Sequence, residues 1–174
     1  ELDADRLAML NQTLASTFTS EPLDGDSAAW MRVLATAEKS GTAFVLVRPD
    51  GARLIRLTEA GRAAMRSVRG EDVGASDAWR ALDVAVLHAL VFDAALGVTP
   101  DEVRAGEHVS YTHSDEEASA AVRAGTNGAQ LAVLLNATPA AAVCAVARAG
   151  DRMPQKSTYF HPKLKTGLVI NPLW

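Results

Sequence analysis

The sequence lacks several features that mark particular classes of protein. It has a single cysteine, Cys144, which excludes an internal disulfide framework and a cysteine-ligated metal cluster. Its longest apolar run, around residues 84–96, is interrupted by His88 and Asp93 and is shorter than the ~20 residues that a membrane-spanning helix requires. The chain begins with Glu1, and its first residues show no signal peptide. We therefore expect a cytoplasmic protein with no membrane partner.

Positive charge is also scarce, and it is unevenly placed. The 174 residues include 17 basic and 21 acidic side chains, a net charge of -4. This balance argues against a nucleic-acid partner, because such binding needs a basic surface. Three of the four lysines nevertheless fall in residues 151–174, where Asp151 is the one acidic residue. The tail is therefore interpreted either as a small anion-binding segment or as a solvated terminal segment that happens to be basic.

The pattern of apolar residues predicts one α/β domain over residues 1–174, with a weak internal break near residues 70–76. We expect a mixed sheet of about five or six strands covered by helices. Strand and capped helix occur twice over residues 108–150, which predicts a β-α-β-α stretch. Helices are predicted over residues 3–18, 27–41, 58–69, 79–96, 114–125 and 138–150, with a further short helix that begins at Thr99. Strands are predicted over residues 43–47, 53–57, 108–112, 129–135, 159–160 and 168–170.

The basic tail contains the strongest candidate chemistry. Residues 150–157 are similar to a phosphate-binding P-loop, but Gln155 replaces the second glycine and the segment follows a predicted helix rather than a strand. Lysine and hydroxyl groups still bind phosphate or carboxylate without a P-loop. The alternative is a loop whose hydroxyls bond to its own backbone. The candidate ligand-binding residues are Lys156, Ser157, Thr158, His161, Lys163 and Thr166, joined by Tyr111 and His113 from the predicted strand 108–112, which we expect to lie beside residues 153–166.

Other chemistry-bearing residues have simpler interpretations. His113 precedes three acids that resemble a hard-metal site, but acids in the first turn of a helix complement the helix dipole, so we expect no metal. Ser114 and Glu117 form a predicted capping box. His88 lies in an apolar helix and Cys144 has no histidine near it in sequence, so neither is assigned to catalysis. The motifs identify no cofactor and no complete catalytic set.

Three stretches resemble a bacterial family called domain of unknown function 1015. The longest is Met153-Pro154-Gln155-Lys156-Ser157-Thr158-Tyr159-Phe160-His161-Pro162-Lys163-Leu164-Lys165-Thr166-Gly167-Leu168-Val169, and the others are residues 79–88 and 109–113. The likeness covers roughly residues 77–172. This chain departs from the family at His161, where a second tyrosine is common, and at Lys165, where an apolar residue is common.

The resemblance implies that this chain is the C-terminal part of a longer protein. Family members carry an upstream half with an aspartate-glycine-histidine-histidine-arginine motif, reminiscent of ParB-like proteins and of free serine kinases, and this chain lacks that motif. The resemblance therefore implies a phosphate- or carboxylate-binding loop that contributes to a phosphotransferase completed by the upstream half. The alternative is a non-catalytic scaffold that docks on that half or on a second copy of itself.

Overall fold

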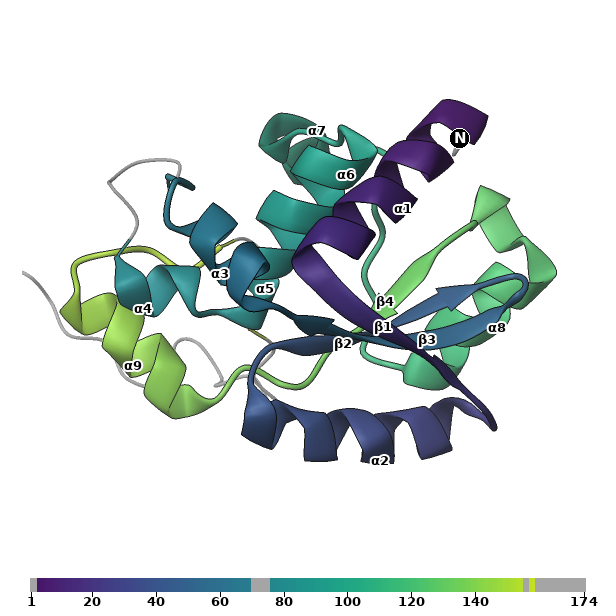
Figure 1. Cartoon of the computed structure of the whole chain (residues 1–174), viewed down its shortest axis with the longest axis horizontal. Helices are drawn as coiled ribbons and strands as arrows, with labels where there is room; N and C mark the ends of the chain where they lie inside the picture. The colour runs from purple at the N-terminus through teal and green to yellow at the C-terminus, as the bar shows by residue number, and fades with distance from the viewer. Residues whose placement is uncertain (1–2, 70–75, 155–156, 159–174) are drawn as a thin grey trace, which may run out of the picture.

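The computed structural model describes residues 3–69, 76–154 and 157–158 (Figure 1). Within them, four strands form one antiparallel sheet in the order β1-β3-β2-β4. The predicted α/β class is confirmed, with fewer strands than expected. The predicted strands 159–160 and 168–170 lie outside the described residues, as do residues 70–75 of the break predicted near residues 70–76. The strands are β1 (Phe18–Leu23), β2 (Ala43–Arg48), β3 (Gly51–Leu57) and β4 (Ala132–Leu134).

Helices lie on both faces of the sheet, with α2 below it and α1, α6 and α7 above it in Figure 1. None of the helices in the described ranges is long and apolar enough to cross a membrane. The helices are α1 (Ala4–Thr17), α2 (Ser27–Ala37), η1 (Glu38–Ser40), α3 (Glu59–Met65), α4 (Asp77–Arg80), α5 (Asp83–Val86), the π-helix η2 (Leu87–Asp93), α6 (Ala94–Leu96), α7 (Pro100–Ala105), α8 (Asp115–Ala124), η3 (Thr126–Gly128) and α9 (Ala140–Arg148).

Local sequence signals set several of these boundaries. Thr58 begins α3 because its hydroxyl accepts a hydrogen bond from the Gly61 amide at 3.2 Å. Thr99 forms a complete capping box with Glu102 at the start of α7. The turn that joins β2 to β3 is the predicted one, and it ends at Gly51, whose φ of 146° is a conformation that favours glycine.

Strand β2 is the centre of the core, because its side chains are buried on both faces of the sheet. Phe44 and Leu46 pack on one face with α1, α5, η2 and α6. Val45 and Val47 pack on the other face with α2, where Trp30 is buried. Leu10, before the sequence break, and Val91, after it, belong to the same hydrophobic cluster. Residues on both sides of the predicted break therefore share one core.

Two predicted elements are wrong. Residues 108–112 do not form a strand: His108 adopts a φ of 60°, a left-handed conformation that ends extended backbone, and the β-α-β-α stretch is therefore absent. The predicted helix over residues 79–96 is interrupted where Leu82 takes an extended backbone between α4 and α5. This interruption places Asp83 at the start of a new helix.

Strand β1 was not predicted at all. It pairs along its full length with β3, from Phe18 opposite Leu57 to Leu23 opposite Ala52. Its residues are mostly exposed, as expected for a strand at the edge of a sheet, and Pro22 is tolerated there because an edge strand has unpaired positions.

Candidate functional site

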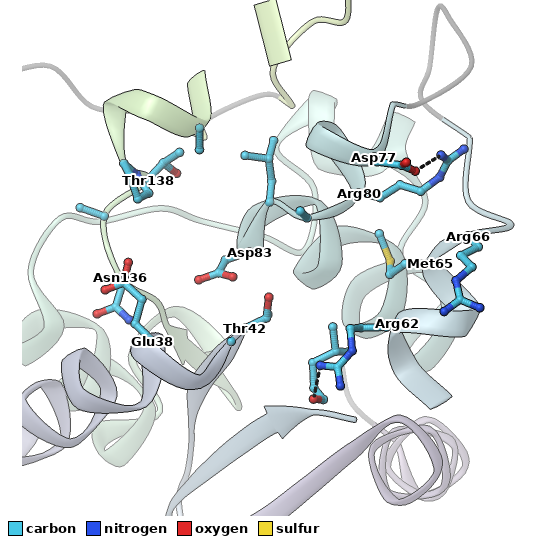
Figure 2. A pocket seen from close by; sticks show the side chains of 17 residues that line it. Glu38, Thr42, Arg62, Met65, Arg66, Asp77, Arg80, Asp83, Asn136 and Thr138 are labelled. Atoms are coloured by element: carbon cyan, nitrogen blue, oxygen red, sulfur yellow. Dashed lines mark hydrogen bonds and ion pairs between the residues drawn. The ribbon is translucent and has the colours of Figure 1, made fainter. Parts of the chain in front are cut away.

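A cavity of about 490 Å³ opens at the end of the sheet where β2 begins and β3 ends (Figure 2). This volume is in the range of small-molecule sites, about 300–1,000 Å³. The lining comes from the η1–β2 connection, the end of β3, helices α3, α4 and α5, and the segment that joins β4 to α9. The lining residues are Glu38, Gly41, Thr42, Leu57, Arg62, Met65, Arg66, Asp77, Arg80, Ala81, Leu82, Asp83, Asn136, Ala137, Thr138, Pro139 and Ala142.

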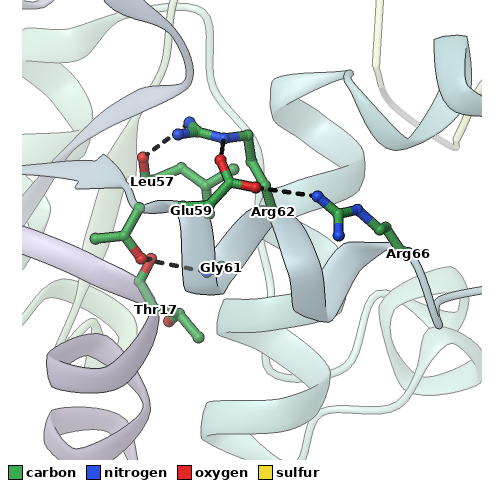
Figure 3. A network of polar contacts seen from close by, with 7 residues as sticks. Thr17, Leu57, Glu59, Gly61, Arg62 and Arg66 are labelled. Carbon is green, nitrogen blue, oxygen red and sulfur yellow. Dashed lines mark hydrogen bonds and ion pairs between the residues drawn. The ribbon is translucent and has the colours of Figure 1, made fainter.

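Arginines from α3 and α4 form one side of the cavity (Figure 2). The guanidinium groups of Arg62 and Arg66 both bond to Glu59, at 2.9 Å and 3.0 Å (Figure 3). The hydrogen bond and the charge of Arg62 lower the pKa of Glu59. Because two guanidinium groups share one carboxylate, this end of α3 keeps a net positive charge. Arg66 is 72% exposed, so its charge faces solvent at the rim.

Arg80 contributes less charge than the two arginines of α3. Its Nη1 lies 3.4 Å from a carboxylate oxygen of Asp77, and its Nε donates to the Val68 carbonyl at 3.2 Å. Both members of the Arg80–Asp77 pair line the cavity, so this part of the wall is neutral overall.

Acidic and neutral polar groups gather on the other side. In Figure 2, Glu38, Asn136 and Thr138 lie opposite the arginines, and Asp83 and Thr42 lie between the two sides. Burial raises the pKa of Asp83, and the nearby Glu38 carboxylate raises it further, whereas a hydrogen bond with the Thr42 hydroxyl opposes both effects.

The segment after α9 contacts the elements around the cavity at two points. Asp151 accepts a hydrogen bond from the Ser76 amide at 2.5 Å, which holds the segment against the start of α4. The Thr138 hydroxyl donates to the Ser157 carbonyl at 2.9 Å, and Thr138 lines the cavity. The beginning of the predicted anion-binding segment therefore reaches the rim.

The predicted site residues are only partly brought together. Ser157 does not line the cavity, although its carbonyl accepts from the lining residue Thr138. Its hydroxyl donates to the Pro154 carbonyl at 2.5 Å, as in the alternative of a loop that bonds to its own backbone. Thr158 follows it and is exposed. Tyr111, 44% exposed, and His113 lie in the connection between α7 and α8 and are not among the lining residues. Lys156, His161, Lys163 and Thr166 lie outside the described residues.

Sequence reasoning missed the polar groups that line this cavity. Glu38, Thr42 and Asp83 come from three separate segments, and no motif joins them. One signal was present, since Asp83 is an acidic residue at the edge of the most apolar stretch of the chain. Such a residue either forms a pair or faces a cavity.

A second acidic cluster was also missed. Ligand atoms of Glu102, Glu107 and His108 all lie within 4.8 Å of one another. Glu102 already accepts hydrogen bonds from the amide and hydroxyl of Thr99, both at 2.8 Å, which explains its position as part of a helix cap. Exposed acids of this kind stabilise the start of a helix without a metal.

No family model, curated protein or solved structure matches the chain. The resemblance of residues 77–172 to domain of unknown function 1015 stays a prediction.

Proposed function

We propose that the chain binds a small molecule carrying a phosphate or carboxylate group in the cavity at the end of the sheet. The observation that supports this most directly is the hydrogen bond from Thr138 to the Ser157 carbonyl, because it joins the cavity lining to the segment that the sequence assigns to anion binding. The shared Glu59 leaves positive charge at Arg62 and Arg66 on the same cavity. Lys156 and Lys163 would add the remaining positive charge.

The resemblance to domain of unknown function 1015 extends this proposal to chemistry. In that view the upstream half of a longer protein supplies the catalytic groups of a phosphotransferase, and this chain supplies part of the anion site. This extension is an analogy between families and rests on the sequence motif alone.

A non-catalytic interaction domain is the second candidate. It is favoured by the arginine pairs, since Arg62, Arg66 and Arg80 all have a carboxylate partner within the chain without any ligand. The hydroxyl of Ser157, which bonds within its own turn, favours it too. The partner would be the upstream half or a second copy of the chain.

Thermal unfolding with inorganic phosphate, propylphosphonate and acetate separates the two functions. A ligand at about 100 times its dissociation constant adds ~2.7 kcal/mol to the free energy of unfolding. We expect such a shift for at least one anion, and we expect Lys156→Ala, Lys163→Ala and Arg66→Gln to reduce it. Lys39→Ala is the matched control, because Lys39 is the one lysine outside residues 151–174 and does not line the cavity. If none of the anions shifts the unfolding temperature, the scaffold function is favoured instead.

A further inference from the structure

The end of the cavity opposite the arginines has the properties of a separate recognition element. Asp83, at the start of α5, and Thr42, at the start of β2, lie between the two sides, with Glu38 and Asn136 close by (Figure 2). The Asn136 amide donates to the Leu34 carbonyl at 3.2 Å, which fixes the side chain and leaves its oxygen as an acceptor. This end of the cavity therefore presents mostly hydrogen-bond acceptors.

Within the part of the chain that the structure describes, the arginines of the cavity wall bond to other carboxylates. Arg62 and Arg66 bond to Glu59, and Arg80 bonds to Asp77. Among the ion pairs of residues 3–69, 76–154 and 157–158, none involves Asp83 or Glu38.

Asp83 also keeps hydrogen-bonding capacity. An ionised carboxylate accepts about four hydrogen bonds. Burial raises the pKa of Asp83 and the adjacent Glu38 raises it further, whereas the Thr42 hydroxyl lowers it. Asp83 is therefore a half-buried carboxylate that stands outside the ion pairs of the described residues. A positively charged hydrogen-bond donor at this position would stabilise the ionised form of Asp83.

We propose that the acidic end of the cavity, formed by Asp83, Glu38, Thr42 and Asn136, binds a positively charged nitrogen group of the ligand, such as a primary ammonium. This inference rests on the proposed function, which places the anionic group of the same ligand near the arginines and the tail. The ligand class is therefore a short molecule with a phosphate or carboxylate at one end and an amine at the other. An ammonium group offers three donors, which suits an acceptor-rich end.

Matched ligands test this inference by calorimetric titration of the full chain. 3-Aminopropylphosphonate and propylphosphonate share the anion and differ in the amine, and propylamine has the amine alone. We expect the amine to tighten phosphonate binding at least about tenfold, equivalent to ~1.4 kcal/mol. Asp83→Asn should remove this preference without weakening the binding of propylphosphonate. Glu38→Gln should weaken the preference for the amine-bearing phosphonate, and its exposed position makes this variant compatible with folding.

Asp101→Asn is the control, because Asp101 lies in the first turn of another short helix, outside the cavity. Equal affinity for the two phosphonates in the unaltered chain would overturn the inference and leave the proposed function standing. Propylamine binding that Asp83→Asn abolishes, without phosphonate binding, would support the acidic end and contradict the anion site. Absence of binding by all three ligands would overturn both proposals.

Discussion

Replacement of Gly61 by alanine tests a glycine position at which two elements of the fold pack closely. Gly61 lies in the first half of α3, where that helix passes the end of α1 (Figure 3). A Cβ atom at this position would lie 2.4 Å from the Cδ1 atom of Leu57 and 2.5 Å from the carbonyl oxygen of Thr17. Both distances are far shorter than a normal contact, so one of the neighbours must move.

The two neighbours differ in how easily they move. The end of the Leu57 side chain rotates, whereas the Thr17 carbonyl belongs to the backbone and accepts hydrogen bonds from the amide and the hydroxyl of Thr58, at 3.0 Å and 2.9 Å. A shift of that carbonyl weakens both bonds, each of which contributes about 1 kcal/mol. Overpacking itself costs roughly 1–3 kcal/mol.

Helix propensity acts in the opposite direction. Alanine in place of glycine stabilises a helix interior by about 1 kcal/mol. We therefore expect Gly61→Ala to lower the free energy of unfolding by about 2 kcal/mol in total, with the packing terms from the Thr17 carbonyl outweighing propensity. For a chain of this size the unfolding temperature should fall by roughly 4–8 °C.

Urea denaturation and calorimetry both measure this difference. The matched control is Ala60→Gly, since Ala60 is the exposed neighbour of Gly61 in the same helix. The stability that this variant loses measures helix propensity alone, because no steric contact changes. We expect the control to destabilise by no more than about 1 kcal/mol. A Gly61→Ala protein as stable as the unaltered chain, or more stable, would refute the packing argument and the close approach of α3 to Thr17.

Two further predictions concern the contact between the segment after α9 and α4, and the core between α1 and the sheet. The Ser76 hydroxyl and amide lower the pKa of Asp151, so this carboxylate stabilises the fold above its ordinary pKa and loses that effect as the pH falls through the lowered value. Asp151→Asn should lower the unfolding temperature at pH 7, and the difference should shrink as the pH falls below the ordinary carboxyl pKa, whereas a difference that persists in strong acid would contradict this. Leu10 is fully buried, so Leu10→Ala should lower the free energy of unfolding by about 2–5 kcal/mol, measured by chemical denaturation. Met9 in the same helix is 51% exposed, so Met9→Ala should change that free energy by less than about 0.5 kcal/mol. Similar losses for the two variants would contradict the orientation of α1 on the sheet.

The parts of the fold that sequence predicted well are those that local chemistry determines. The α1 and α2 boundaries, the cap at Thr99 and the turn before Gly51 depend on residues within one turn of one another. The half-formed capping box at Ser114 shows the limit of such reasoning. The Ser114 hydroxyl accepts a hydrogen bond from the Glu117 amide at 3.1 Å, as predicted. The Glu117 carboxylate, however, accepts from the Thr112 hydroxyl instead of from the Ser114 amide.

Errors occur where distant contacts outweigh local preference. Strand β1 has no alternation of apolar and polar residues, and its place in the sheet comes from pairing with β3, a segment distant in the sequence. The apolar pattern over residues 79–96 is equally compatible with one long helix and with several short ones, because both bury the same side chains. Val86 and Val91 are buried although the helix is interrupted at Leu82.

That interruption is also why the candidate site escaped sequence analysis. In a continuous helix Asp83 would be one acid among apolar neighbours, whereas the extended backbone of Leu82 turns the chain so that Leu82 is buried and Asp83 reaches the cavity beside Thr42. Thr42 in turn stands directly before the most buried strand, β2, so its position is fixed by the core on both faces of the sheet. A half-buried carboxylate thus lies beside the start of the most buried strand and faces a cavity that is open to solvent. A ligand group that donates to Asp83 would therefore meet an acceptor that needs little reorganisation on binding, which is the property that distinguishes a recognition site from an incidental gap between helices.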